Sequence, residues 1–93
     1  MYTLFAKLKF LLPHATSLKD KRQVCRSIVD RTRQRYNVSV AEVGTQDILQ
    51  TLTLGVAIVS GEYRHGKNKL EEIIQFMEKN PETELISVEQ DDA

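Results

Sequence analysis

The sequence contains few of the residues from which chemical sites are usually built. Among 93 residues there are one cysteine, two histidines, two prolines, four glycines and no tryptophan. Cys25 has no partner for an internal disulfide, and one Cys with two His does not make a usual zinc site. A small chain without disulfides fits a reducing compartment, so we expect a cytoplasmic protein. With so little Pro and Gly there is no linker, and we expect one domain over residues 1–93.

Long apolar runs are also missing. No stretch approaches the roughly 20 apolar residues that span a bilayer. The apolar segment at residues 2–12 is interrupted by Lys7 and Lys9, and no small-residue cleavage site follows it. It is therefore a poor signal peptide, and we expect no membrane partner.

Recognisable catalytic and cofactor motifs are absent. There is no glycine-rich phosphate loop, nucleophile elbow or metal-ligand spacing. Cys25 falls on the apolar face of a predicted helix and is interpreted as a core thiol. His14 and His65 lie in or near loops and have no predictable partner. We expect no catalytic residue, metal or cofactor, and an enzyme or metabolite sensor is only a third hypothesis.

Alternating and helical patterns divide the chain into six elements. Residues 2–12 alternate with period two, as a strand with one buried face does, and Pro13 ends them. Ser17 is a helix cap with the acidic Asp20 in the first turn. The second helix has two possible starts, an early one capped by Ser60 or a later one after Gly66. The expected elements are strands at 2–12, 38–43, 51–60 and 85–88, and helices from Ser17 to Asn37 and from the 60–66 region to Asn80.

This order is β-α-β-β-α-β, which predicts an α+β, ferredoxin-like sandwich. Right-handed crossovers place both helices on one face of a four-stranded antiparallel sheet. The first and third strands are then central, with their even-numbered side chains under the helices.

The other sheet face is expected to be open. An RNA-recognition motif would carry aromatic side chains on both central strands, but only Phe5 is present. Small, partly apolar faces often meet a second copy, so this face predicts a homodimer contact. Gly55 allows close backbone approach, with a local bulge as the alternative. The predicted dimer face comprises Phe5, Gly55, Ala57 and Val59.

The zero net charge, from 13 basic and 13 acidic residues, hides a division along the chain. Residues 1–60 hold nine basic and four acidic groups, whereas residues 61–93 hold four basic and nine acidic groups. The first helix has two basic flanks. The helical wheel places Lys19, Arg22, Arg26 and Arg33 on one flank, and Lys21, Arg31 and Arg35 on the other.

The first of these flanks predicts a contact with RNA phosphates, since the guanidinium fork of arginine suits phosphate. The alternative is a solvated helix, or one that pairs with the acidic half of the same or a neighbouring molecule. The loop at residues 44–50 is either an ordinary polar loop or a ligand contact, and Glu42 with Asp47 is a candidate carboxylate pair.

Four sequence blocks in order resemble the YlxP-like family of small bacterial proteins of unknown function. They are residues 17–22 (SLKDKR), 36–43 (YNVSVAEV), Gln46-Asp47 with Gln50, and 54–60 (LGVAIVS). The resemblance implies a ferredoxin-like fold, a cytoplasmic bacterial protein and, through neighbouring genes, an association with translation and ribosome maturation. It implies no catalytic residue. Gly44 replaces a frequent acidic residue of that family, and Gly66 replaces an apolar residue of the second helix.

The sequence therefore supports two functional hypotheses. The first is a non-enzymatic accessory module that binds structured RNA or the ribosome through Lys19, Arg22, Arg26 and Arg33, without DNA specificity. The alternative is a homodimeric protein-interaction module that binds no nucleic acid.

Overall fold

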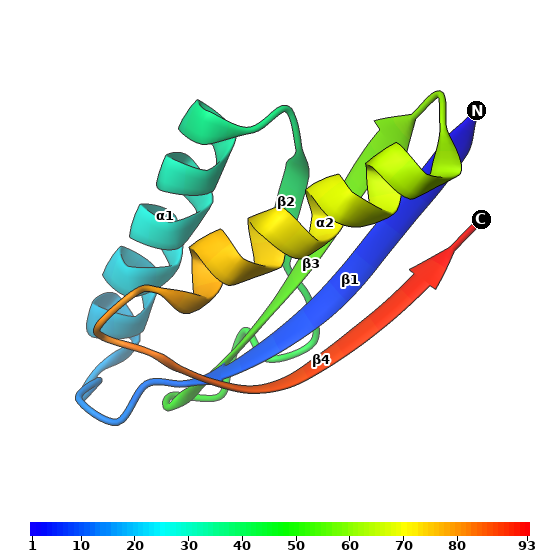
Figure 1. Cartoon of the computed structure of the whole chain (residues 1–93). Coiled ribbons are helices and arrows are strands. Elements are labelled where there is room, and N and C mark those ends of the chain that lie inside the picture. Colours follow the sequence, from blue (N-terminus) through cyan, green and yellow to red (C-terminus); the bar gives the residue numbers. More distant parts are fainter.

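The computed structural model describes residues 1–93 as two helices over one sheet (Figure 1). The six elements are β1 (Tyr2–Leu11), α1 (Leu18–Arg35), β2 (Ser39–Glu42), β3 (Thr51–Ser60), α2 (Tyr63–Glu78) and β4 (Glu84–Asp92). The strands lie in the order β2-β3-β1-β4, and all three pairs are antiparallel. The ferredoxin-like β-α-β-β-α-β fold predicted from the sequence is confirmed. None of the helices is long and apolar enough to span a lipid bilayer.

The core forms between the helices and the even-numbered side chains of the two central strands. Leu4, Leu8, Leu52 and Leu54 are completely buried, as the period-two alternation of both strands predicts. From α2, the stripe of Leu70, Ile73, Ile74 and Met77 packs onto them.

Helix α1 begins where the sequence predicts. The Ser17 side chain accepts a hydrogen bond of 3.1 Å from the backbone N–H of Asp20, which is the expected cap. The Asp20 carboxylate in turn accepts hydrogen bonds from the backbone N–H and the hydroxyl of Thr16, at 3.0 and 2.8 Å. These bonds hold the pKa of Asp20 below its usual value.

Helix α2 begins before Gly66, but the predicted cap by Ser60 is wrong, because the cap residue is Glu62 and no side chain caps the helix. The helix begins at Tyr63 and contains Gly66, which is buried. A Cβ at this position would lie 2.5 Å from Leu4 Cδ1 and 2.8 Å from Ser60 Cβ. Only glycine lets the first turn pack this closely onto β1 and β3.

Strand β4 is longer than predicted and contains an irregularity. It runs through Asp91 and Asp92, which the sequence placed after the strand. The register with β1 shifts between Lys9 and Phe10, so Ile86 has no partner there. The bulge considered for Gly55 is absent, because Gly55 pairs with Lys7 and Ala41 in continuous register.

Candidate nucleic-acid interface on the first helix

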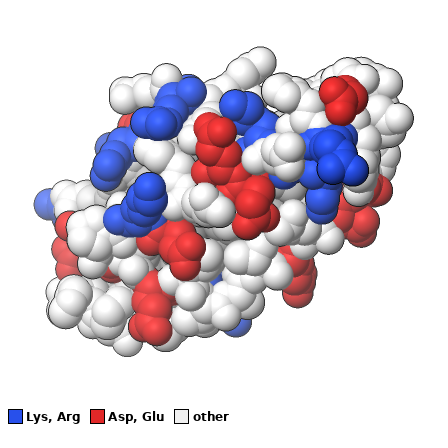
Figure 2. Space-filling model, viewed as in Figure 1, with Lys and Arg blue, Asp and Glu red and all other residues white.

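The four basic residues that define the basic flank, Lys19, Arg22, Arg26 and Arg33, are all solvent-exposed on α1. Figure 2 shows basic side chains gathered over α1, with acidic side chains over the adjoining part of α2. At 1.5 Å per residue, the flank extends over about 21 Å of helix. It is therefore a row of cations along the helix.

Arg33 fixes where the basic flank lies. Its Nη2 donates a hydrogen bond of 2.8 Å to the backbone oxygen of Val40 in β2. Because β2 is an edge strand, this carbonyl has no strand partner on its outer side. The basic flank therefore runs beside the β2 edge, and Arg33 covers part of that edge against strand pairing.

The other flank does not behave as one surface. The prediction that Lys21 is an exposed flank residue is wrong: it is only 2% exposed. The Arg35 guanidinium lies over the rings of Tyr36 and Phe76, at 5.7 and 5.3 Å from their centroids. Arg31 is exposed and faces the end of α2 across a hollow. Thus Lys21 and Arg35 have structural partners within the molecule.

Three members of the basic flank have no charged or hydrogen-bonding partner. The ion pairs of the protein are Lys7 with Glu89, Lys21 with Glu42, and Lys69 with Glu72. None of them joins α1 to the acidic second half of the chain. Lys19, Arg22 and Arg26 therefore present their charges to solvent, and pairing with the acidic half of the same molecule does not occur.

The buried Lys21 ammonium anchors the loop between β2 and β3. It lies 2.9 Å from Glu42 Oε2 and donates hydrogen bonds to the backbone oxygens of Thr45 and Ile48. The Thr45 hydroxyl donates to Glu42 and accepts from the backbone N–H of Thr53, at 3.2 and 2.8 Å. Glu42 thus pairs with Lys21, whereas Asp47, the other member of the candidate carboxylate pair, is exposed.

The glutamines of this loop also hold it in place. Gln46 Nε2 donates to the backbone oxygen of Glu42, and Gln50 Nε2 donates to that of Ala15, both at 3.2 Å. Gly44 has φ +83°, a left-handed conformation that glycine adopts at least cost. Three of the blocks that carry the family resemblance therefore meet around Lys21, where they position a loop against α1.

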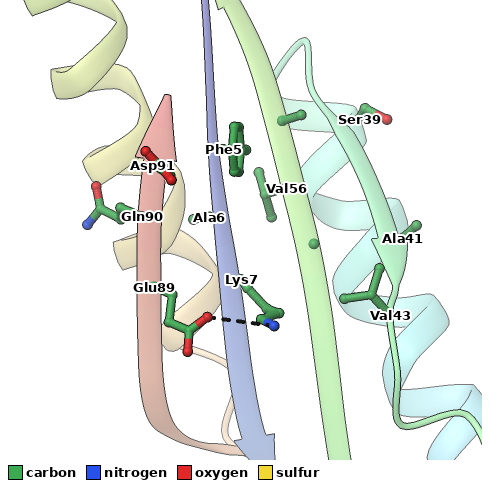
Figure 3. A pocket seen from close by; sticks show the side chains of 12 residues that line it. Phe5, Ala6, Lys7, Ser39, Ala41, Val43, Val56, Glu89, Gln90 and Asp91 are labelled. Atoms are coloured by element: carbon green, nitrogen blue, oxygen red, sulfur yellow. Dashed lines mark ion pairs between the residues drawn. The ribbon is translucent and has the colours of Figure 1, made fainter. Parts of the chain in front are cut away.

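The open sheet face carries the four residues predicted for dimerisation. Phe5 and Val59 are exposed, and Gly55 and Ala57 are partly exposed. Phe5, Gly55 and Ala57, but not Val59, border a hollow of 520 Å³, shown in Figure 3, with Ala41 and Val43 on the β2 side and Glu89 and Asp91 on the β4 side. Gly55 makes room for Val43, since an added Cβ would lie 3.3 Å from Val43 Cγ1.

The residues considered for chemistry lie apart from one another. Cys25 is half-buried in α1, and burial raises the pKa of its thiol, with the nearby Glu42 charge adding to the effect. His14 is exposed before α1, and His65 is exposed in the first turn of α2. No group of three or more His, Cys, Asp or Glu side chains is placed to hold a metal ion.

The sequence did not predict a polar hollow of 620 Å³ where the β1–α1 and α2–β4 connections meet. Its lining includes both signs of charge: His14, Arg31, Asp20 and Glu82. Three of these residues lie on α1 or just before it, whereas Glu82 follows α2, about 50 or more positions further along the chain. No local sequence pattern therefore predicts this hollow, and its mixed charges favour no particular ligand.

Comparisons with known proteins identify the family and the fold. A profile of the family described as "Protein of unknown function (DUF503)" matches residues 3–90. The uncharacterized protein YlxP of Bacillus subtilis (strain 168) is 35% identical over 80 residues, covering 86% of this chain and 87% of that protein. A de novo designed protein with a ferredoxin fold, solved by NMR, covers 98% of this chain and 84% of its own at a TM-score of 0.55 and 15% identity. The last likeness concerns the fold alone.

Proposed function

Because the chain belongs to the DUF503 family of proteins of unknown function, its family brings no activity with it, and we propose that the protein is a non-enzymatic module that binds structured RNA in the cytoplasm. The basic flank of α1 contacts the phosphate backbone. A ribosomal RNA is the favoured partner, in line with the association with translation that the family resemblance implies.

The observation that carries this proposal is the unpaired state of Lys19, Arg22 and Arg26. An exposed cation that already forms an ion pair must lose that pair before it binds phosphate, whereas these three need not. Cations that neutralise phosphates release condensed counterions from the nucleic acid, which is a large favourable term at low salt. Arg33 joins them if its hydrogen bond to Val40 leaves its remaining donors free.

The absence of nearby aromatic side chains indicates which kind of RNA fits. The exposed aromatic residues Tyr2, Phe5 and Tyr63 lie on β1 and at the start of α2, not beside the basic flank. Readers of single-stranded RNA usually stack bases on aromatic rings. A row of cations without rings instead suits the backbone of a folded RNA. It also reads no base edges, so no DNA specificity is expected.

The test is binding to a labelled RNA hairpin, followed by fluorescence anisotropy over 50–300 mM salt. The double variant Arg22→Glu/Arg26→Glu should lose most of the affinity and lower the magnitude of the salt slope by about 2, or about 1 per phosphate contact. The matched control is Arg64→Glu/Lys79→Glu, which reverses two exposed charges at the two ends of α2. It should keep both the affinity and the slope.

Two results would contradict the proposal. One is no binding at 50 mM salt to the hairpin or to purified ribosomal RNA. The other is an equal loss of affinity in the α1 variant and the α2 control, which would show only a general charge effect. A metabolite that specifically raised the melting temperature would instead favour the enzyme or sensor hypothesis.

A further inference from the structure

On the open sheet face, the Phe5 ring forms a ridge that stands beside the hollow. Phe5 on β1 and Ala57 on β3 are direct register partners, and Figure 3 shows the Phe5 ring standing beside the small side chains of β3 and β2. Phe5 is 38% exposed and is the only aromatic ring on this face. The hollow beside it owes its 520 Å³ to residues with little or no side chain: Ser39, Ala41, Gly55 and Ala57.

We propose that a second copy of the chain covers this face, with the Phe5 ring of each copy seated in the partner's hollow over Gly55 and Ala57. A ridge next to a hollow on one surface is self-complementary, because a two-fold axis brings each against the other. Each copy then makes the same contact, with its Phe5 ring in the partner's hollow. This inference is independent of RNA binding, since the basic flank lies on α1, on the helix side of the sheet.

The register of β1 and β3 selects the direction of the axis. A two-fold axis parallel to the strands and between β1 and β3 places β1 of one copy over the partner's β3. Because Phe5 and Ala57 lie at the same level, this axis sets Phe5 directly over the partner's Ala57. An axis across the strands would instead place β1 over the partner's β1, and the two rings would not meet the hollows.

The charges of the face favour the same axis. An axis across the strands places β4 against β4, so that Glu89 and Asp91 face their own copies. The axis along the strands instead moves β4 over the partner's β2, so that these carboxylates no longer face their own copies. Lys7 and Glu89 already form an ion pair of 3.6 Å, which reduces the net charge brought to the contact. The chain as a whole carries no net charge, so two copies do not repel each other overall.

Sedimentation equilibrium and light scattering over 1–500 µM protein test this proposal. The wild type should reach twice the 10.7 kDa of one chain. Ala57→Glu places a carboxylate in the hollow and should raise the dimer Kd about 100-fold or more, because the charge would be buried without a partner. Phe5→Ala should also weaken the dimer by removing the ridge. Gln75→Glu, an equal charge change on the exposed side of α2, should have no effect.

The exchange variant Phe5→Ala/Ala57→Phe tests the axis itself. It moves the ridge from β1 to β3 while the symmetry keeps the two positions opposite each other, so dimerisation should recover relative to Phe5→Ala. Circular dichroism and urea unfolding identify the variants that fold. A wild-type monomer at 500 µM overturns the proposal, whether or not some other protein occupies the face. A dimer that the folded Ala57→Glu variant leaves intact also overturns it, as does a folded exchange variant that stays as weak as Phe5→Ala.

Discussion

The Lys21 ammonium and the Glu42 carboxylate lie 2.9 Å apart and join α1 to the end of β2. The Lys21 side chain is 2% exposed and that of Glu42 is 19% exposed, so water screens the pair far less than a surface ion pair. The same ammonium also bonds two backbone carbonyls of the following loop. One lysine of α1 thus holds both the end of β2 and the loop that leads from β2 to β3.

We therefore expect Lys21→Met to destabilise the protein by about 3 kcal/mol, the range seen when one partner of a buried ion pair is removed. The substitution leaves the carbonyls of Thr45 and Ile48 without their donor. Urea unfolding measures the loss. Lys19→Met removes an exposed lysine from the same helix and should change stability by no more than about 0.5 kcal/mol.

The double variant Lys21→Met/Glu42→Gln should cost clearly less than the two single changes added together, because each single change leaves a charge unpaired. Additive effects would mean that the two side chains do not stabilise each other. The loop should also become more sensitive to proteolysis in Lys21→Met. Equal digestion of the variant and the wild type would argue against the anchoring role.

A second prediction concerns the close packing of α2. Gly66→Ala should lower the unfolding free energy by up to about 2 kcal/mol, because overpacking costs about 1–3 kcal/mol and alanine regains about 1 kcal/mol of helix propensity. The obstructing Ser60 Cβ is next to the backbone and cannot turn away. Gly61→Ala is the control, since nothing lies within 4 Å of its added Cβ. A more stable Gly66→Ala protein would contradict the packing described for this turn.

Lys21 and Gly66 also show where sequence reasoning stops. The strands were predictable because two separate runs, residues 2–12 and 51–60, both alternate and both bury their even-numbered side chains, apart from the exposed Tyr2. Lys21 stands at helical spacing between Leu18 and Cys25, and Gly66 stands four residues before Leu70, so both occupy apolar stripes. Their partners lie on other elements, and a helical wheel carries no information about those. A lysine or glycine within such a stripe is nevertheless the signal that could have identified them.

The candidate interface was predicted only in part for the same reason. Exposure of Lys19, Arg22 and Arg26 followed from the helical wheel, because one flank of an amphipathic helix faces solvent. The bond from Arg33 to Val40 and the stacking of Arg35 depend on β2 and α2. Likewise, the hollow on the open face is formed by residues from four strands, of which the sequence had drawn attention only to Phe5, Gly55 and Ala57.

Asp20 gives a prediction about pH. Its pKa is lowered in the folded protein by hydrogen bonds from Thr16, so below the usual value the unfolded chain binds more protons at this site. Its contribution to stability is present above the unfolded pKa of 3.8 and is lost as the pH falls through the folded value. Between pH 5 and pH 2, Asp20→Asn should therefore lose less stability than the wild type. Parallel urea curves for both proteins over this range would contradict the assignment.

Cys25 gives a prediction about reactivity. Burial raises the pKa of its thiol, so less thiolate is present at neutral pH than in the unfolded chain. Iodoacetamide should alkylate the folded protein slowly at pH 7.5 and the urea-unfolded protein much faster. Rapid alkylation of the folded wild type would mean that burial does not protect the thiol.

The last prediction separates the two proposals by their surfaces. Along β2, the Val40 side chain points into the core beneath α1, whereas Ala41 points into the open hollow, so the basic flank and the hollow lie on opposite sides of the sheet. Ala57→Glu should therefore keep its affinity for a hairpin that spans only one basic flank, within about two-fold. Conversely, Arg22→Glu/Arg26→Glu should still dimerise, because charges outside a contact mainly alter association rates. If instead Ala57→Glu abolished hairpin binding while remaining folded, RNA would have to contact the sheet face or both chains at once, and the assignment to α1 alone would fail.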